Sequence, residues 1–158
     1  MNEWLTVRRL FAAAAVLPIA AVCAALVTQH VFGMLPCPWC VLQRAIFVGI
    51  SLAALMGALG GRLLQRLAAL VMLALAACGI SAALWQHFVA AASASCNRTL
   101  ADRILGGLGI DAMWPEVFAP YTSCADAAAK LLGVPYEFYS LTLFVVLGAT
   151  AVHLLRRA

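Results

Sequence analysis

Four long apolar runs constrain the fold of this chain more than any other feature. They cover residues 10–31, 41–60, 67–89 and 136–155. Each has about 20 residues, the length that a helix needs to cross roughly 30 Å of hydrocarbon. With 158 residues, 66% hydrophobic and only 10% charged, the chain carries more apolar surface than one aqueous core of that size can bury. The sequence therefore predicts an all-α membrane protein, a four-transmembrane-helix bundle that forms a single domain over residues 1–158.

Most cationic residues lie at one end of these runs. They precede the first run, occupy the short loop 61–66 and follow the fourth run: Arg8, Arg9, Arg62, Arg66, Arg156 and Arg157. Because cytoplasmic loops are enriched in Lys and Arg, we expect both termini to be cytoplasmic. The loops 32–40 and 90–135 then lie on the outer side of the membrane. The charges form pairs and no continuous basic face, so the pattern excludes nucleic acid as a partner.

The six cysteines fall into two groups. Cys23 and Cys78 lie within apolar runs, where a cysteine usually packs as a small hydrophobic residue. The other four lie on the predicted outer side: Cys37, Cys40, Cys96 and Cys124. Disulfides form and persist on that side of a plasma membrane. This segregation points to disulfide chemistry.

The motif Cys37-Pro38-Trp39-Cys40 stands at the start of the second run. A CxxC motif serves zinc, haem and redox chemistry alike. Haem attachment needs a histidine after the second cysteine, and Val41 is found there instead. A four-thiolate zinc site would use all four outer cysteines, but the second pair is far more widely spaced than zinc ligands usually are. Redox chemistry is favoured, and a structural zinc site stays open.

The position of Cys40 favours a reactive thiolate. It lies near a predicted helix N-terminus, where unpaired amides and the helix dipole stabilise negative charge. Arg44 lies one turn further along the same face, and its cation adds to this effect. An arginine in a spanning helix is costly unless it finds a partner or snorkels to the interface. A functional role and simple snorkelling are both compatible with Arg44.

His87 is predicted at the outer end of the third run, at the depth of Arg44. Two hydrogen-bond donors at one depth, beside a reactive thiol and within reach of lipid, suit the carbonyl oxygens of a quinone. His30 and His153 are interpreted as interface anchors.

Cys96 and Cys124 bracket an apolar part of the long outer loop, which suits a short interfacial helix. If they pair, closing the loop would contribute roughly 3–4 kcal/mol in the simple chain model. A static structural disulfide therefore stays open, although it leaves the nearby CxxC motif unexplained.

In combination, these motifs resemble the disulfide bond formation protein B (DsbB) family over nearly the whole chain. The resemblance rests on Gln29-His30-Val31, Pro36-Cys37-Pro38-Trp39-Cys40 with Arg44, Gln86-His87, the pair Cys96 and Cys124, and Leu132-Gly133-Val134-Pro135.

The resemblance implies a thiol:quinone oxidoreductase of the bacterial inner membrane, with its active site facing the periplasm. A reduced thioredoxin-like oxidase, DsbA, would attack a Cys96–Cys124 disulfide at Cys96. Electrons would pass to Cys37–Cys40 through an exchange that involves Cys124 and Cys37, and Cys40 would face the quinone. Arg44 and His87 match the family's quinone-contacting residues. The resemblance implies ubiquinone or menaquinone and no metal.

One departure concerns Gln43, where many family members carry an acidic residue. We expect this to remove a potential partner of Arg44 and to leave its charge freer to act on Cys40 or the quinone. Two alternatives remain. One is a related thiol oxidoreductase, of the vitamin K epoxide reductase type or a paralogue with a dedicated client. The other is a non-catalytic membrane subunit with structural disulfides or zinc.

Overall fold

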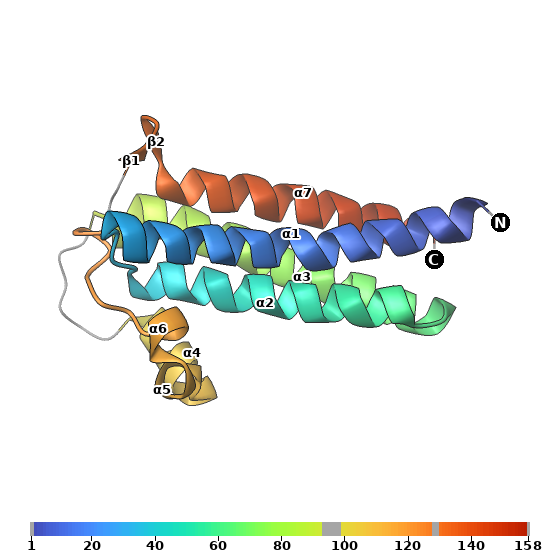
Figure 1. Ribbon diagram of the computed structural model, residues 1–158, viewed down its shortest axis with the longest axis horizontal. Coiled ribbons are helices and arrows are strands. Elements are labelled where there is room, and N and C mark those ends of the chain that lie inside the picture. Colours follow the sequence, from blue (N-terminus) through green and yellow to red (C-terminus); the bar gives the residue numbers. More distant parts are fainter. Residues whose placement is uncertain (1, 93–98, 128–129, 158) are drawn as a thin grey trace.

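The computed structural model describes residues 2–92, 99–127 and 130–157, so Cys96 lies outside the described residues. Four long helices pack side by side: α1 (Asn2–Phe32), α2 (Pro38–Leu59), α3 (Arg62–Trp85) and α7 (Tyr136–Arg157) (Figure 1). Within these ranges, four helices are long and apolar enough to cross a membrane. The all-helical bundle of four long apolar helices is confirmed. Both chain ends lie at the same end of the bundle (Figure 1).

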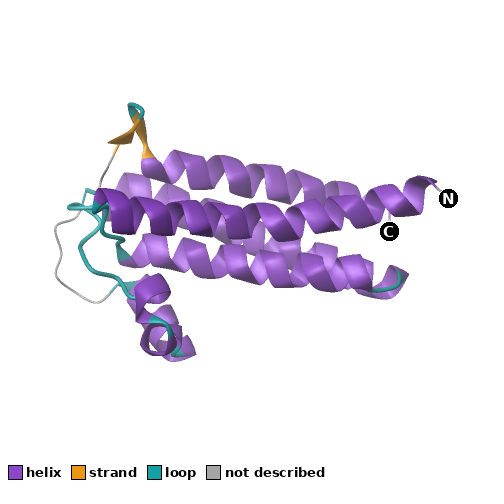
Figure 2. Ribbon diagram, viewed as in Figure 1, coloured by secondary structure: helices purple, strands orange, loops and turns teal. Residues whose placement is uncertain are grey.

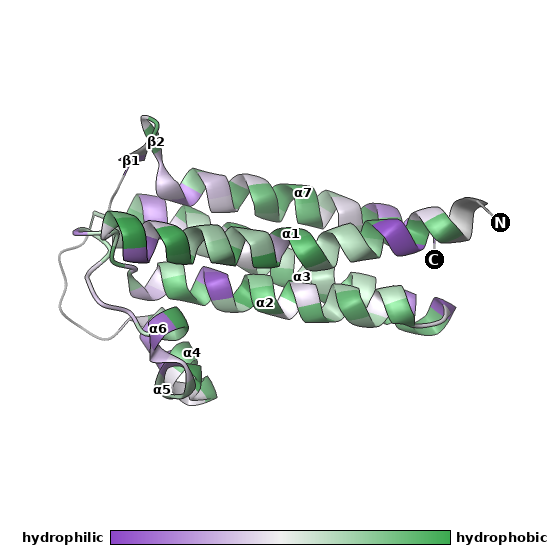
Figure 3. Cartoon of the chain, viewed as in Figure 1, coloured by the Kyte–Doolittle hydropathy of each residue, from purple (hydrophilic) through white to green (hydrophobic). Residues whose placement is uncertain are grey.

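Hydrophobic residues make up most of the four long helices (Figure 3). Large hydrophobic side chains are exposed on every long helix, including Val16, Leu52, Leu70 and Val145. A helix of a water-soluble bundle carries polar residues on its outer face. This surface is therefore suited to contact with lipid.

Small residues allow the helices to approach closely. Gly57 of α2 lies against the ring of Phe11 from α1, and Gly79 of α3 lies against the ring of Phe144 from α7. A Cβ atom at either glycine would overlap that ring. The rings of Phe47 and Phe144 stack with centroids 4.1 Å apart, which joins α2 to α7. Close packing of this kind is the main source of helix association in lipid.

The second helix begins at Pro38, three residues before the apolar run that predicts it. Proline suits the first position of a helix, because its fixed φ is already helical and its missing N–H needs no partner there. Cys37 becomes the N-cap, and its sulfur accepts a hydrogen bond from the backbone N–H of Cys40. The helix start therefore brings both cysteines of the motif onto one turn.

Three short helices of the outer loop lie beside the start of α2: α4 (Leu100–Leu108), α5 (Ile110–Met113) and α6 (Pro115–Phe118) (Figure 1). A capping box between Thr99 and Asp102 starts α4. This helix buries Ala101 and Leu105, while Leu108 in its last turn is exposed.

The outer loop also contains a short β-hairpin, which the sequence analysis did not predict. Strands β1 (Lys130–Leu131) and β2 (Val134–Pro135) form an antiparallel hairpin just before α7 (Figure 2). Its two turn residues, Leu132 and Gly133, have φ values of 53° and 83°. Positive φ at both central positions gives the twist that a two-residue hairpin needs.

Candidate functional site: a thiol cluster beside a membrane cavity

The two cysteines of the CxxC motif lie close together at the start of α2. Their Sγ atoms are 2.8 Å apart. Cys37 is fully buried, whereas Cys40 is partly exposed. Both are thiols in this structure, and the small separation means that a disulfide between them needs little movement of the chain.

A third sulfur completes the cluster. Cys124, from the segment after α6, is buried, and its thiol is hydrogen-bonded to that of Cys37. Cys37 and Cys124 share one hydrophobic cluster with Leu105 and Phe118 of the outer loop. Three of the four predicted redox cysteines therefore meet at one point, with Cys37 in the middle.

The position of Cys37 between two sulfurs sets the protonation of the cluster. Its hydrogen bonds with Cys124 and Cys40, together with burial, raise the pKa of Cys37 far above its ordinary value. The hydrogen bond from Cys37 lowers the pKa of Cys124. Cys37 is thus the proton donor of the pair, and Cys124 is its thiolate-forming member.

Arg44 lies inside the bundle and is only 6% exposed, so it does not snorkel to the surface. Its Nη1 donates to Oε1 of Gln29 at 2.8 Å and to the carbonyl oxygen of Val117 at 3.1 Å. Its Nη2 donates to the carbonyl oxygen of Ala25 at 3.5 Å. Arg44 therefore ties α2 to α1 and to α6. No ion pair of Arg44 is found in the part of the chain that the structure describes, so neutral oxygens balance its charge there.

A cavity of about 210 Å³ opens next to Cys40, between α1, α2, α7 and the outer end of α3. Its walls are apolar along most of their length, with Val22, Phe47 and Leu143 among them. Polar side chains complete the lining: Thr28, Cys40, Gln43, Arg44, Gln86, Tyr136, Glu137, Tyr139 and Ser140. A small flat apolar ring with hydrogen-bonding oxygens at its edge fits walls of this kind. The residues present therefore fit the head group of a quinone.

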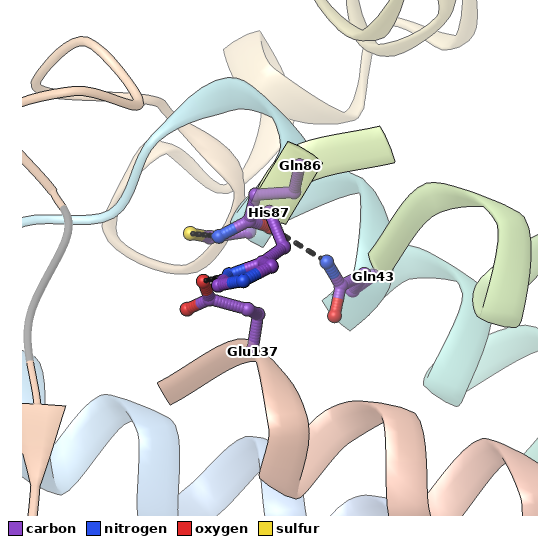
Figure 4. A network of polar contacts seen from close by, with 5 residues as sticks. Gln43, Gln86, His87 and Glu137 are labelled. Carbon is purple, nitrogen blue, oxygen red and sulfur yellow. Dashed lines mark hydrogen bonds and ion pairs between the residues drawn. The ribbon is translucent and has the colours of Figure 1, made fainter. Parts of the chain in front are cut away.

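His87 lies beside this cavity but is not among the described residues that line it. It belongs to the π-helical turn η1 (Gln86–Ala90) that continues α3. Its Nδ1 is 2.6 Å from Oε1 of Glu137 (Figure 4). Its ring meets those of Phe88 and Phe138 edge-on. Glu137 does line the cavity, so His87 reaches it through this carboxylate. A direct quinone contact by His87 stays a prediction.

Two residues of the cavity wall were missed by the sequence reasoning. Gln86 donates from Nε2 to Sγ of Cys40 at 3.2 Å, and Glu137 pairs with His87. Glu137 had a usable signal, because an acidic residue in the first turn of a spanning helix needs a partner as much as Arg44 does. For Gln86, the only signal in the sequence was its position next to His87.

The remaining cysteines stand apart from the cluster. Cys23 of α1 and Cys78 of α3 are both exposed on the outside of the bundle. Each faces the surrounding medium and not the interior of the bundle, and a non-redox role for both stays a prediction. For an apolar side chain in lipid, such a position carries no penalty.

These features define a class: a membrane-spanning helical bundle with a thiol cluster beside a cavity. Residues 7–154 match the family model described as disulfide bond formation protein DsbB. The disulfide bond formation protein B of Aromatoleum aromaticum is 32% identical over 89% of this chain and 90% of the relative. That of Ralstonia nicotianae is 33% identical over 92% of this chain and 91% of the relative. The chain belongs to the DsbB family of membrane proteins.

The pKa directions in the cluster predict different alkylation of two thiols. In fully reduced protein, Cys124 should react with iodoacetamide at a lower pH than Cys37, because a lowered pKa leaves more thiolate at a given pH. Mass spectrometry of the two peptides over a pH series measures both midpoints. In a Cys37→Ala variant the midpoint of Cys124 should move upward. Equal midpoints for the two thiols would contradict this order.

Proposed function

We propose that this chain is a thiol:quinone oxidoreductase that reoxidises a periplasmic thioredoxin-like dithiol oxidase of the DsbA type. The observation that carries the proposal is the position of Cys37, which contacts Cys124 on one side and Cys40 on the other. Cys40 in turn faces the cavity. The three sulfurs therefore form a path from the outer loop to a site within the bundle.

The first step is attack by a thiolate of the reduced partner on a Cys96–Cys124 disulfide at Cys96. A mixed disulfide forms, and Cys124 leaves as a thiolate. The pKa of Cys124 is lowered by its hydrogen bonds with the Cys37 thiol and with the backbone of Trp39. The bond with Trp39 does not need a free thiol at Cys37, so it supports departure of this anion while Cys37 is still bonded to Cys40. A thiol with a low pKa is the better leaving group in such an exchange.

In the second step Cys124 attacks the sulfur of Cys37 in a Cys37–Cys40 disulfide. The Cys37–Cys124 bond forms as the Cys37–Cys40 bond breaks, and Cys40 leaves as a thiolate. Burial of Cys37 excludes competing thiols from solution. The contact between Cys37 and Cys124 supports this pairing, because exchange needs the attacking sulfur next to the one attacked.

The partner's second thiol then resolves the mixed disulfide and releases Cys96, which re-forms its bond to Cys124. Cys37 and Cys40 are left reduced, and the partner is left oxidised. A quinone in the cavity would accept two electrons and two protons and become a quinol. Closure of Cys37–Cys40 completes the cycle, so that the partner's two electrons and two protons end on the quinone.

The chain's own residues would hold the quinone head group. Arg44 provides a fixed cation in the cavity wall, where negative charge on a carbonyl oxygen would be stabilised. The pair of Glu137 and His87 joins this wall to a partly exposed imidazole, which suits the supply of protons. Exposed Ala24 of α1 and Tyr139 of α7 also line the cavity, so a lipid-soluble ligand would enter between these helices.

The same arrangement supports an orientation in a bacterial inner membrane. The termini and the loop between α2 and α3 lie at one end of the bundle, and the outer-loop helices lie at the other (Figure 1). The arginine pairs of the sequence cluster at the first end, which favours a cytoplasmic position for that end. The thiol cluster then faces the periplasm.

Purified protein with ubiquinone and a reduced DsbA-type oxidase tests this function. We expect quinone absorbance to fall as the partner is oxidised, and a Cys40→Ser variant to lose this turnover. A Cys23→Ser variant is the matched control and should keep it, because Cys23 lies outside the cluster. Retained turnover in Cys40→Ser would refute the relay. Quinone reduction by small thiols but never by the DsbA-type oxidase would favour a related enzyme with another client.

Arg44 provides a second prediction. Replacing Arg44 with Gln should raise the apparent KM for quinone about tenfold, because a hydrogen bond to a charged group contributes roughly 1.5–3 kcal/mol. Steady-state kinetics measure KM, and thermal unfolding in detergent controls for lost packing. Arg66→Gln, at the opposite end of the bundle, should leave KM unchanged. An unchanged KM in Arg44→Gln would contradict a role of Arg44 in quinone binding and leave it the structural role of joining helices.

A further inference from the structure

Two buried glutamines form a directed chain of hydrogen bonds that ends on the sulfur of Cys40. Nε2 of Gln43 donates to Oε1 of Gln86 at 2.7 Å. Nε2 of Gln86 then donates to Sγ of Cys40 at 3.2 Å (Figure 4). The two amides are only 3% and 6% exposed, so water does not compete for these bonds. They come from neighbouring elements, α2 and η1.

The direction of this chain follows from the two ends of an amide group. An amide has an NH₂ that only donates and an oxygen that only accepts. Because Gln43 donates to the oxygen of Gln86, the NH₂ of Gln86 faces the sulfur. A donor at this place stabilises a thiolate more than a thiol, since the thiolate is the stronger acceptor.

We propose that Gln86 is a catalytic residue that stabilises the thiolate of Cys40, and that Gln43 is a positioning residue that holds the amide of Gln86 in its donating orientation. This inference rests on the proposed function, in which Cys40 is the leaving group of the exchange with Cys124. A stabilised thiolate leaves faster and stays available beside the cavity. A neutral amide provides this without placing another charge inside the bundle.

The local backbone explains how Gln86 reaches the sulfur while its neighbour does not. Gln86 opens the π-helical turn η1, and such turns often mark functional positions in helices. Successive residues of a helix point about 100° apart. Gln86 therefore faces α2, whereas His87 faces Glu137 of α7 (Figure 4).

Other titratable groups also surround Cys40. Cys37 lies 2.8 Å away at the N-cap of α2, and Arg44 lies one turn further along the same helix. Tyr136 and Glu137 face the cavity from α7. Among the described residues that line the cavity, those of α1 are all uncharged. Two further titratable groups reach Cys40 only indirectly. Cys124 bonds to Cys37, and His87 bonds to Glu137.

The test measures the pH midpoint at which iodoacetamide alkylates Cys40. All variants carry Cys37→Ser, Cys96→Ser and Cys124→Ser, so that Cys40 is the one remaining thiol of the site. Cys23 and Cys78 lie outside the site and are read separately by mass spectrometry of their own peptides. Gln86→Leu should raise the midpoint by about one pH unit, because one hydrogen bond to a charged group is lost. Gln65→Leu is the matched control. Gln65 is a buried glutamine at the far end of the bundle, bonded to the carbonyl oxygen of Gly60, and its loss should leave the midpoint unchanged.

Gln43→Glu separates positioning from packing, and it keeps a polar group of the same length. A carboxylate at this position only accepts, so the NH₂ of Gln86 would turn toward it and present its oxygen to the sulfur. The carboxylate also repels the thiolate directly, and Gln43→Glu combined with Gln86→Leu measures that effect alone. The rise in the midpoint of Cys40 caused by Gln43→Glu should be larger with Gln86 present than in the Gln86→Leu background. A midpoint that falls or stays unchanged in Gln43→Glu would overturn the positioning role. An unchanged midpoint in Gln86→Leu would overturn the whole inference.

This measurement needs neither quinone nor a partner protein. Its outcome is therefore distinct from that of the turnover assay. Shifted midpoints in a protein that never reduces quinone would support the amide chain and contradict the proposed function. Unshifted midpoints in an enzyme that reduces quinone would contradict the role of the two amides and support the proposed function.

Discussion

The contact of Cys37 with two other sulfurs is the interaction on which the rest of this structure depends. Pro38 starts α2 at a point that leaves Cys37 as its N-cap and turns Cys40 back toward it. The outer loop is bound next to the start of α2, because the backbone N–H of Tyr121 donates to the carbonyl oxygen of Pro36 at 3.0 Å. Arg44 of α2 holds α6 in place by its hydrogen bond to the carbonyl oxygen of Val117. The helix start and the loop together bring Cys124 to the motif.

Polar groups inside a membrane bundle are costly, and most of those described in this chain gather at its outer end and bond to one another. The set comprises Gln29, Gln43, Arg44, Gln86, His87 and Glu137, and each has a hydrogen bond or ion pair within it. Four of them, Gln43, Arg44, Gln86 and Glu137, line the cavity that opens beside Cys40. A purely structural bundle would have replaced them with apolar residues at little loss of stability. Their concentration beside a reactive thiol is best explained by chemistry at that site.

Hydropathy was sufficient to predict the four helices, because lipid requires long apolar runs and allows little else. The spacing of Cys37 and Cys40 was sufficient to predict that their thiols lie close together at the start of α2. The partners of the buried polar groups were harder to predict, because they depend on how each helix is rotated. Gln43 was interpreted as a missing partner of Arg44, but adjacent residues of a helix face different neighbours, and Gln43 pairs with Gln86. Arg44 lacks a carboxylate in the described residues, yet three oxygens hold its charge in place.

The central claim is that Cys124 and Cys37 are the sulfurs that exchange between the outer loop and the CxxC motif. The most direct test uses a Cys40→Ser, Cys96→Ser variant, oxidised with diamide, digested without reduction and examined by mass spectrometry. We expect a Cys37–Cys124 disulfide to form in nearly all molecules, because the two thiols already touch. Free thiols at both Cys37 and Cys124, or disulfides that join these residues to a second chain, would contradict the claim.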